Sequence, residues 1–149
     1  MSTNIPIIIN WNDFNLKKNQ ISLTKFVENN SDKIRELYID AIDFLGKKKI
    51  NQLSFIELLK LNNDFSIWWM SLIYEKNFYK SPQVINCLKL IALEYLIIDK
   101  KFLKVKIINL PNICNNSIYI LQKKLKVDID WKINNEKQGN IFYYKIYSL

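Results

Sequence analysis

The spacing of hydrophobic residues changes along the chain, and each spacing predicts a different kind of secondary structure. Residues 5–11, IPIIINW, form a short β-branched run that ends before the turn-forming pair Asn12-Asp13, which predicts a buried strand. Residues 104–110, KVKIINL, and residues 127–133, VDIDWKI, have the same character, the second by strict alternation. These three segments are the predicted strands.

Helical spacing dominates the rest of the chain. Hydrophobic residues at three- and four-residue intervals predict helices over residues 23–29, 31–49, 54–61, 66–77, 81–99 and 115–126. Ser31 is a candidate N-cap of the second helix, and Ser54 forms a capping box with Glu57 at the start of the third. Ser81 is a candidate N-cap ahead of Pro82, which suits the first position of the fifth helix.

The order of these elements predicts an α/β fold. Strand, helix and strand follow one another from residue 104 to residue 133, which is typical of a βαβ unit with parallel strands and a right-handed crossover. The first strand is expected to join the same sheet. We therefore expect a three-layer Rossmann-like domain with a small parallel sheet and a long helical insertion after the first strand. A length of 149 residues suits one domain, residues 1–149, and no Gly/Ser- or Pro-rich linker divides it.

Composition removes several kinds of chemistry. The chain has no histidine, which excludes the commonest general base and metal ligand. Its two cysteines, Cys87 and Cys114, form no CxxC pair, so no metal site is expected, and both are predicted to be reduced and buried or nearly so. Two glycines cannot supply a GxGxxG or P-loop motif, and no cofactor is expected. One of them, Gly46, suits the C-terminal end of the helix over residues 31–49.

The net charge of +8 allows more than one interpretation. Of the 22 basic residues only Arg35 is arginine, whereas proteins that read nucleic-acid sequence favour arginine for bidentate contacts. Specific nucleic-acid binding therefore ranks last. A solvated lysine surface explains the charge, and so does attraction to a phosphorylated ligand or an anionic membrane face.

No segment of the sequence predicts export or a membrane span. The start of the chain lacks the basic and apolar regions of a signal peptide. The longest apolar run, CLKLIALEYLII, is interrupted by Lys89 and Glu94 and is shorter than a span requires. We expect a cytoplasmic protein, with contact to the inner face of the membrane as an open alternative.

The segment FSIWWMSLIYEKNFYKSP, residues 65–82, is the strongest candidate for a site. On a helix, Trp68 and Trp69 fall on an apolar stripe that a packed core explains. Ser71 and Glu75 are four residues apart and would lie on one face of that helix.

Polar residues follow where this predicted helix ends. Lys76, Lys80 and Ser81 gather before the next helix, where backbone N–H groups and the helix dipole favour an anion. Simple capping explains Ser81 equally well. Aromatic rings beside hydrogen-bonding side chains also suit a sugar. The carboxylate pair Asp40 and Asp43, at helical spacing among basic residues, is interpreted as a solvated face.

These residues carry a resemblance to a known family. The run IIINW, followed by a WW-x-S-x-x-x-E-K helix and by K-S-P at the start of another helix, resembles bacterial surface-carbohydrate biosynthesis proteins. The two later motifs comprise Trp68, Trp69, Ser71, Glu75, Lys76, Lys80, Ser81 and Pro82. The resemblance covers residues 5–11 and 53–133.

The resemblance implies a glycosyltransferase-like function in O-antigen or capsule synthesis. Such proteins resemble glycosyltransferases with two Rossmann-like domains, the GT-B arrangement, and this chain corresponds to the N-terminal half, which holds the acceptor. A second domain or chain would then be needed for turnover, and the ligand would be a sugar or nucleotide sugar. Glu75 is the implied catalytic or orienting residue. The implied substrate-binding residues are Trp69, Ser71, Lys76, Lys80 and Ser81. The alternative is a non-enzymatic module that docks a partner protein or an anionic membrane.

Overall fold

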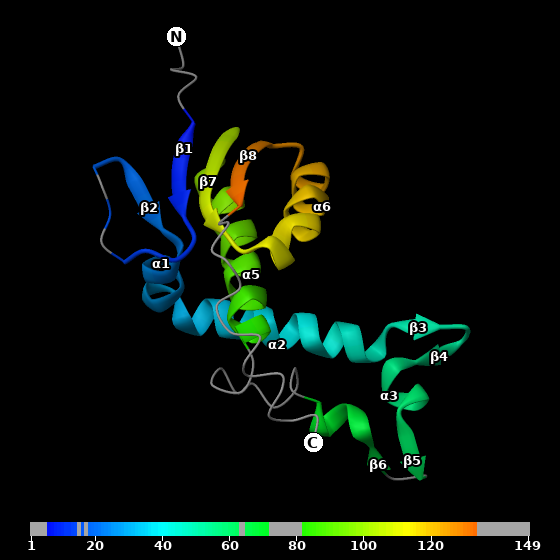
Figure 1. Cartoon of the computed structure of the whole chain (residues 1–149). Coiled ribbons are helices and arrows are strands. Elements are labelled where there is room, and N and C mark those ends of the chain that lie inside the picture. Colours follow the sequence, from blue (N-terminus) through cyan, green and yellow to red (C-terminus); the bar gives the residue numbers. More distant parts are fainter. Residues whose placement is uncertain (1–5, 15, 17, 63–64, 72–81, 134–149) are drawn as a thin grey trace, which may run out of the picture.

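Figure 1 shows the protein as a computed structural model, which describes residues 6–14, 16, 18–62, 65–71 and 82–133. A parallel sheet contains the strands β1 (Ile7–Asn10), β2 (Gln20–Ser22), β7 (Lys104–Leu110) and β8 (Asp128–Ile133). The helices outside the arm are the α-helices α1 (Leu23–Asn29), α2 (Ser31–Lys47), α5 (Pro82–Lys100) and α6 (Asn115–Leu125) and the 3₁₀ helix η2 (Asn112–Cys114). The predicted α/β fold class with a small parallel sheet is confirmed.

The four strands lie in the order β2-β1-β7-β8, and every neighbouring pair is parallel. The register places Ile9 of β1 beside Ile107 of β7, and both side chains are fully buried. The unit β7-α6-β8 is the predicted βαβ unit, and β1 joins its sheet as expected. Two segments about a hundred residues apart in the sequence therefore form the centre of the sheet.

Helix α5 supplies much of the core because it is apolar on several sides. Leu93 and Leu96 of α5 pack with the buried strand residues Ile107 and Ile129 and with Ile118 of α6 in one cluster. Burying such side chains contributes roughly 1.5–3 kcal/mol each. Helix α5 begins at Pro82, as predicted, since proline lacks only an N–H that the first helical turn does not use.

Residues 48–71 form what we call the arm, which lies beyond the C-terminal end of α2 and away from the sheet (Figure 1). Its elements are β3 (Lys49–Ile50), β4 (Leu53–Ser54), α3 (Phe55–Leu58), β5 (Lys60–Asn62), β6 (Phe65–Ser66) and the 3₁₀ helix η1 (Ile67–Met70). Strands β3 and β4 form one antiparallel hairpin, and β5 and β6 form another.

The helical prediction was wrong over much of the arm. The capping box of Ser54 and Glu57 is present, but the helix it opens ends at Leu58 and buries no residue. In the described part of the predicted helix over residues 66–77, residues 67–70 form a 3₁₀ helix and Ser71 has extended backbone angles. Residues 72–77 lie outside the described residues. Isolated short helices are marginal unless one face is packed, and the arm offers little surface for packing.

Smaller differences occur elsewhere. Strand β2 was not predicted, because three residues are too few to show an alternating pattern. Helix α2 has Asn30 rather than Ser31 as its N-cap. Gly46 lies in the last turn of α2, one residue before its end, as predicted, and it is buried. Cys114 is buried as predicted, whereas Cys87 is exposed.

Candidate functional site

Polar side chains gather where β1 and β7 end. The chain passes from β1 to β2 on one side, and β7 later pairs with β1 on the other side, so the direction of winding reverses between β1 and β7. Ligands of open parallel α/β sheets bind outside the carboxyl ends of the strands at such a switch point. The strand-end cluster at this position consists of Asn10, Asn12, Asp13, Lys89 and Asn109.

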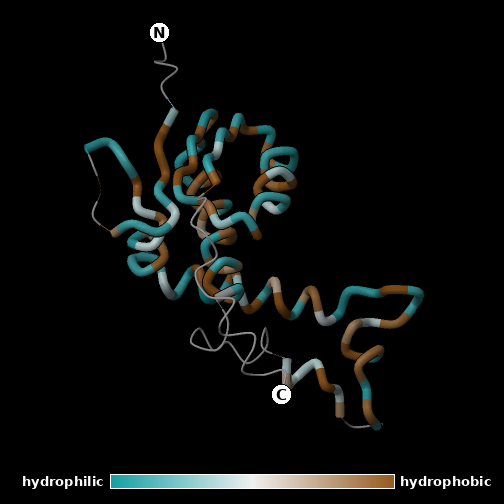
Figure 2. Tube along the Cα trace, in the orientation of Figure 1, coloured by the Kyte–Doolittle hydropathy of each residue, from teal (hydrophilic) through white to brown (hydrophobic). Residues whose placement is uncertain are grey.

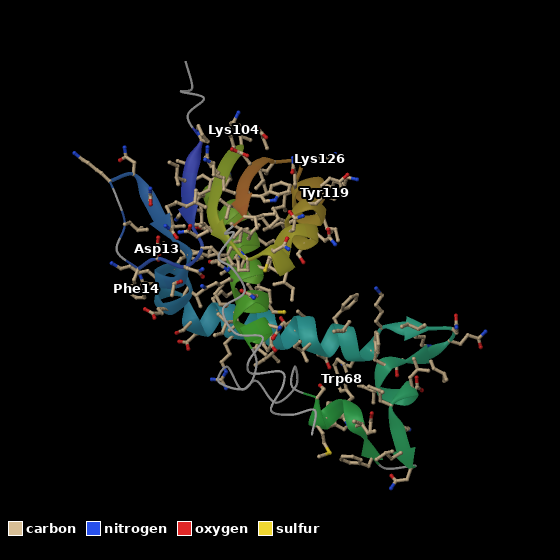
Figure 3. The ribbon with its side chains drawn as sticks, viewed as in Figure 1. Asp13, Phe14, Trp68, Lys104, Tyr119 and Lys126 are labelled. Atoms are coloured by element: carbon tan, nitrogen blue, oxygen red, sulfur yellow. The ribbon has the colours of Figure 1, made fainter. Side chains whose placement is uncertain are left out.

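Asp13 is the centre of this cluster. Its Oδ2 accepts hydrogen bonds from the Nδ2 of Asn10 at 2.7 Å and from the Nδ2 of Asn109 at 3.0 Å. The Oδ1 of Asn10 accepts the backbone N–H of Asp13 at 3.0 Å and that of Asn12 at 3.2 Å, which closes a tight turn after β1. Figure 3 shows Asp13 labelled at this turn. Asn109 adopts a left-handed backbone with φ of 61°, which asparagine tolerates better than most residues.

Lys89 adds a buried positive charge beneath the same turn. Its side chain reaches from α5, is 7% exposed, and donates to the backbone oxygen of Trp11 at 2.8 Å and to Oδ1 of Asn12 at 3.1 Å. The ammonium also lies 6.0 Å from the centre of the Trp11 ring. Desolvation by burial lowers the pKa of Lys89, and the partners above are neutral groups. Amide donors, a carboxylate and an ammonium can together orient a polar ligand.

A second site, the Trp69 groove, lies between α2 and the arm. Its cavity volume is about 320 Å³, and it is lined by Ile39, Asp40, Ile42, Asp43, Ile56, Trp68 and Trp69. Trp69 is 42% exposed, so part of its ring faces solvent. Asp40 and Asp43 are exposed, and Asp43 pairs with Lys47 at 2.7 Å. An aromatic surface with carboxylates beside it therefore borders one hollow.

Trp68 forms the floor that holds this groove in place. It is 5% exposed and packs with Tyr38 and Ile42 of α2 and with Val84 of α5. A Cβ atom on Gly46 would lie 2.9 Å from the indole Nε1 of Trp68, which is closer than packed atoms come. Gly46 is therefore required for close approach of the ring, and Figure 3 shows Trp68 of the arm beside α2.

Of the predicted site residues, the structure describes Trp69 and Ser71. Trp69 lines the groove, and Ser71 follows it in extended backbone, so the helix that was to align Ser71 with Glu75 does not run through Ser71. Glu75, Lys76, Lys80 and Ser81 lie outside the described residues. The stripe prediction holds for Trp68, which is buried.

Other candidate chemistry has a structural explanation. Asp128 and Asp130 of β8 pair with Lys104 and Lys106 of β7 at 3.0 and 3.4 Å. Burial raises the pKa of the Cys114 thiol to about 11, so it stays protonated at neutral pH. Among the residues that the structure describes, no group of histidine, cysteine or acidic side chains could hold a metal ion. Within the same residues, no helix is long and apolar enough to cross a membrane.

Fold and sites together define a Rossmann-like α/β domain with a polar strand-end cluster and a separate aromatic, acidic groove. Comparison of the chain with protein-family models, with curated proteins and with solved structures finds no match. Function therefore has to be argued from the two sites.

Sequence reasoning identified only part of both sites. Asn12 and Asp13 were seen as turn formers, and Asp40 with Asp43 as a solvated pair. Lys89 was noted only as an interruption of an apolar run. That interruption was the available signal, because a lysine among buried helix positions has to reach a polar partner.

Proposed function

We propose that this domain binds a carbohydrate as the acceptor-side, N-terminal half of a glycosyltransferase-like protein in surface-polysaccharide biosynthesis. The supporting observation is the Trp69 groove, in which a half-exposed indole borders a cavity beside two exposed carboxylates. Ligand sites are typically hollows with aromatic walls and a few polar groups that fix orientation.

The chemistry of the groove matches the two faces of a sugar. The C–H face of a pyranose can stack on the Trp69 ring, while Asp40 and Asp43 accept hydrogen bonds from hydroxyl groups. Hydrogen bonds to a carboxylate are stronger than those to neutral acceptors. Carboxylates beside the Trp69 ring repel other anions, so the groove favours neutral or amino sugars over uronic acids.

The proposal divides the work between this domain and a second one. The strand-end cluster lies where parallel sheets of this kind bind ligands, and Asp13 supplies a carboxylate there. Glu75 remains the proposed catalytic or orienting residue, and Ser71, Lys76, Lys80 and Ser81 the proposed substrate contacts beside Trp69. A nucleotide sugar and a second Rossmann-like domain or chain would complete the reaction, in the cytoplasm at the inner face of the membrane.

The proposal is tested by binding of the full chain to an array of O-antigen and capsule repeat oligosaccharides. Trp69→Ala should weaken binding of the best neutral glycan about tenfold, a loss of about 1.4 kcal/mol. The double variant Asp40→Asn, Asp43→Asn should also weaken it and should reduce discrimination against uronic acids. Titration calorimetry measures both effects.

The chain offers a matched control for the carboxylates. Asp99 is exposed and pairs with Lys100 at 2.8 Å, much as Asp43 pairs with Lys47, but it does not line the groove. Asp99→Asn should leave binding unchanged. Equal losses in the control and the groove variants, or glycan binding that survives Trp69→Ala, would refute the assignment of the groove.

A further inference from the structure

For its length, the arm exposes more large hydrophobic side chains than the rest of the described residues do. Nine of the eighteen exposed large hydrophobic side chains among the described residues belong to it. They are Ile50, Leu53, Leu58, Leu59, Leu61, Phe65, Ile67, Trp69 and Met70. Figure 2 shows brown, hydrophobic segments along the arm, away from the sheet, whose strands also contain brown segments. Exposed apolar side chains concentrated in one region are typical of a site of interaction.

The arm has little internal packing to explain these side chains. Both hairpins are two-stranded, and a lone two-stranded hairpin is marginally stable in water. All three residues of β5 are exposed, with Leu61 at 68%, and Met70 at the end of η1 is 70% exposed. Covering these side chains would remove a large apolar area from water. The arm therefore favours contact with an apolar surface.

The charges around this surface identify what covers it. Lys48, Lys49 and Lys60 are exposed on the arm. The carboxylate of Glu57 is already engaged by Ser54, whose backbone N–H and Oγ both donate to it at 2.7 Å. The whole chain carries +8. Apolar side chains edged by lysines match an anionic surface with an apolar interior.

We propose that the arm is a peripheral membrane-docking element that inserts its apolar side chains into the headgroup boundary of an anionic bilayer. Interfacial anchors combine buried apolar area with lysines that attract anionic lipids. A second copy of the chain fits less well, because two arms brought together would juxtapose their lysines. Docking would bring the Trp69 groove, which the arm helps to line, close to the membrane surface. The docking proposal does not depend on carbohydrate binding.

Cosedimentation of the full chain with lipid vesicles tests the proposal. Vesicles of phosphatidylcholine with phosphatidylglycerol should bind the protein, vesicles of phosphatidylcholine alone should bind it much less, and added salt should weaken binding. The double variant Lys48→Gln, Lys49→Gln should lower the partition coefficient by roughly thirtyfold, at about 1 kcal/mol for each lysine. The double variant Leu61→Asp, Met70→Asp should also lower it, by about tenfold or more.

A matched control separates insertion from general surface hydrophobicity. Leu103 is 82% exposed in the turn before β7, outside the arm, so Leu103→Asp should leave vesicle binding unchanged. Melting temperatures should stay close to that of the unaltered protein in all variants, because the replaced side chains are exposed.

Three results would overturn the proposal. One is equal loss of vesicle binding in the Leu103 and the Leu61/Met70 variants. Another is an absence of binding to anionic vesicles. The third is a dimer in analytical ultracentrifugation that Leu61→Asp, Met70→Asp converts to a monomer, which would assign the arm to self-association.

Discussion

The strands of the parallel sheet and those of the arm both contain large aliphatic residues, but most of these residues are buried or partly buried in the sheet and they are exposed in the arm. Val105, Ile107 and Leu110 of β7 are fully buried, whereas Leu61 in the short strand β5 is 68% exposed. Strand β7 has a neighbouring strand on each side and the helix α5 packed against it, but β5 belongs to a hairpin of two strands. The comparison teaches that an apolar strand is buried only when a second layer covers it.

The two regions are also joined in a particular way. Among the described residues of the arm, Trp68 is the only buried hydrophobic side chain, and it packs on α2 over Gly46. The contact between the Trp68 indole and Gly46, with Phe55 and Ile56 packed beside the indole, thus anchors a segment in which most other large side chains are exposed. Substitutions in the core of the parallel sheet should therefore change the stability of the sheet, and substitutions at the contact between Trp68 and Gly46 should change the packing of the arm.

The largest expected effect contrasts core and arm directly. Ile107→Ala should lower the free energy of unfolding by about 2–5 kcal/mol, because it removes buried methyl groups and leaves a cavity. Leu61→Ala should change it by less than about 0.5 kcal/mol, because the side chain is already in water. Urea denaturation measures both. Similar losses in the two variants would show that β5 is buried in solution.

The second prediction tests the anchor. Gly46→Ala should weaken the packing of the arm on α2 by about 1–2 kcal/mol, because the new methyl group meets the Trp68 ring. The gain in helix propensity offsets this loss by about 0.5–1 kcal/mol and is included in that range. Hydrogen exchange should quicken in residues 48–71 and stay unchanged in β1 and β7.

The same anchor predicts energetic coupling between the two residues. Trp68→Leu should cost less in the Gly46→Ala protein than in the unaltered one, since residues in contact do not add independently. Additive losses would contradict the close approach of the indole to Gly46.

The smallest predicted change in the free energy of unfolding concerns Lys89, and its dependence on pH distinguishes it from the changes above. Lys89→Met should cost about 1 kcal/mol at pH 7, because it removes the shorter of the two hydrogen bonds to the Trp11 oxygen while relieving the desolvation of the ammonium. In the folded protein the pKa of Lys89 lies below its ordinary value of 10.5. At a pH between these two pKa values, Lys89 is protonated more in the unfolded chain than in the folded protein. Stability contributed by Lys89 should therefore rise as pH increases through that interval.

Urea denaturation of both proteins between pH 7 and pH 10.5 measures this difference. The advantage of the unaltered protein over Lys89→Met should grow with pH. An advantage that falls as pH rises would show that the ammonium is stabilised, rather than desolvated, in the folded protein.

Prediction from sequence succeeded where a pattern was long and its burial was decided locally. The alternating residues of β8 and the apolar residues of α5 identify their elements, and Pro82 marks the start of α5. It failed in the arm, where helical spacing around Trp68 and Trp69 belongs to a 3₁₀ turn. A window of a few residues cannot tell whether a second layer will be present to hold a helix.

The sequence by itself determined the α/β class, the βαβ unit and the absence of a glycine-rich phosphate loop. Tertiary structure alone decided which distant residues meet. Asn10 and Asn109 converge on Asp13 because parallel pairing of β1 and β7 brings their carboxyl ends to one edge of the sheet. The sequence places Gly46 at the end of a helix, but only the tertiary structure shows that the Trp68 ring packs against it. Local spacing encodes periodicity, whereas a site depends on contacts between segments far apart in the chain, which spacing does not specify.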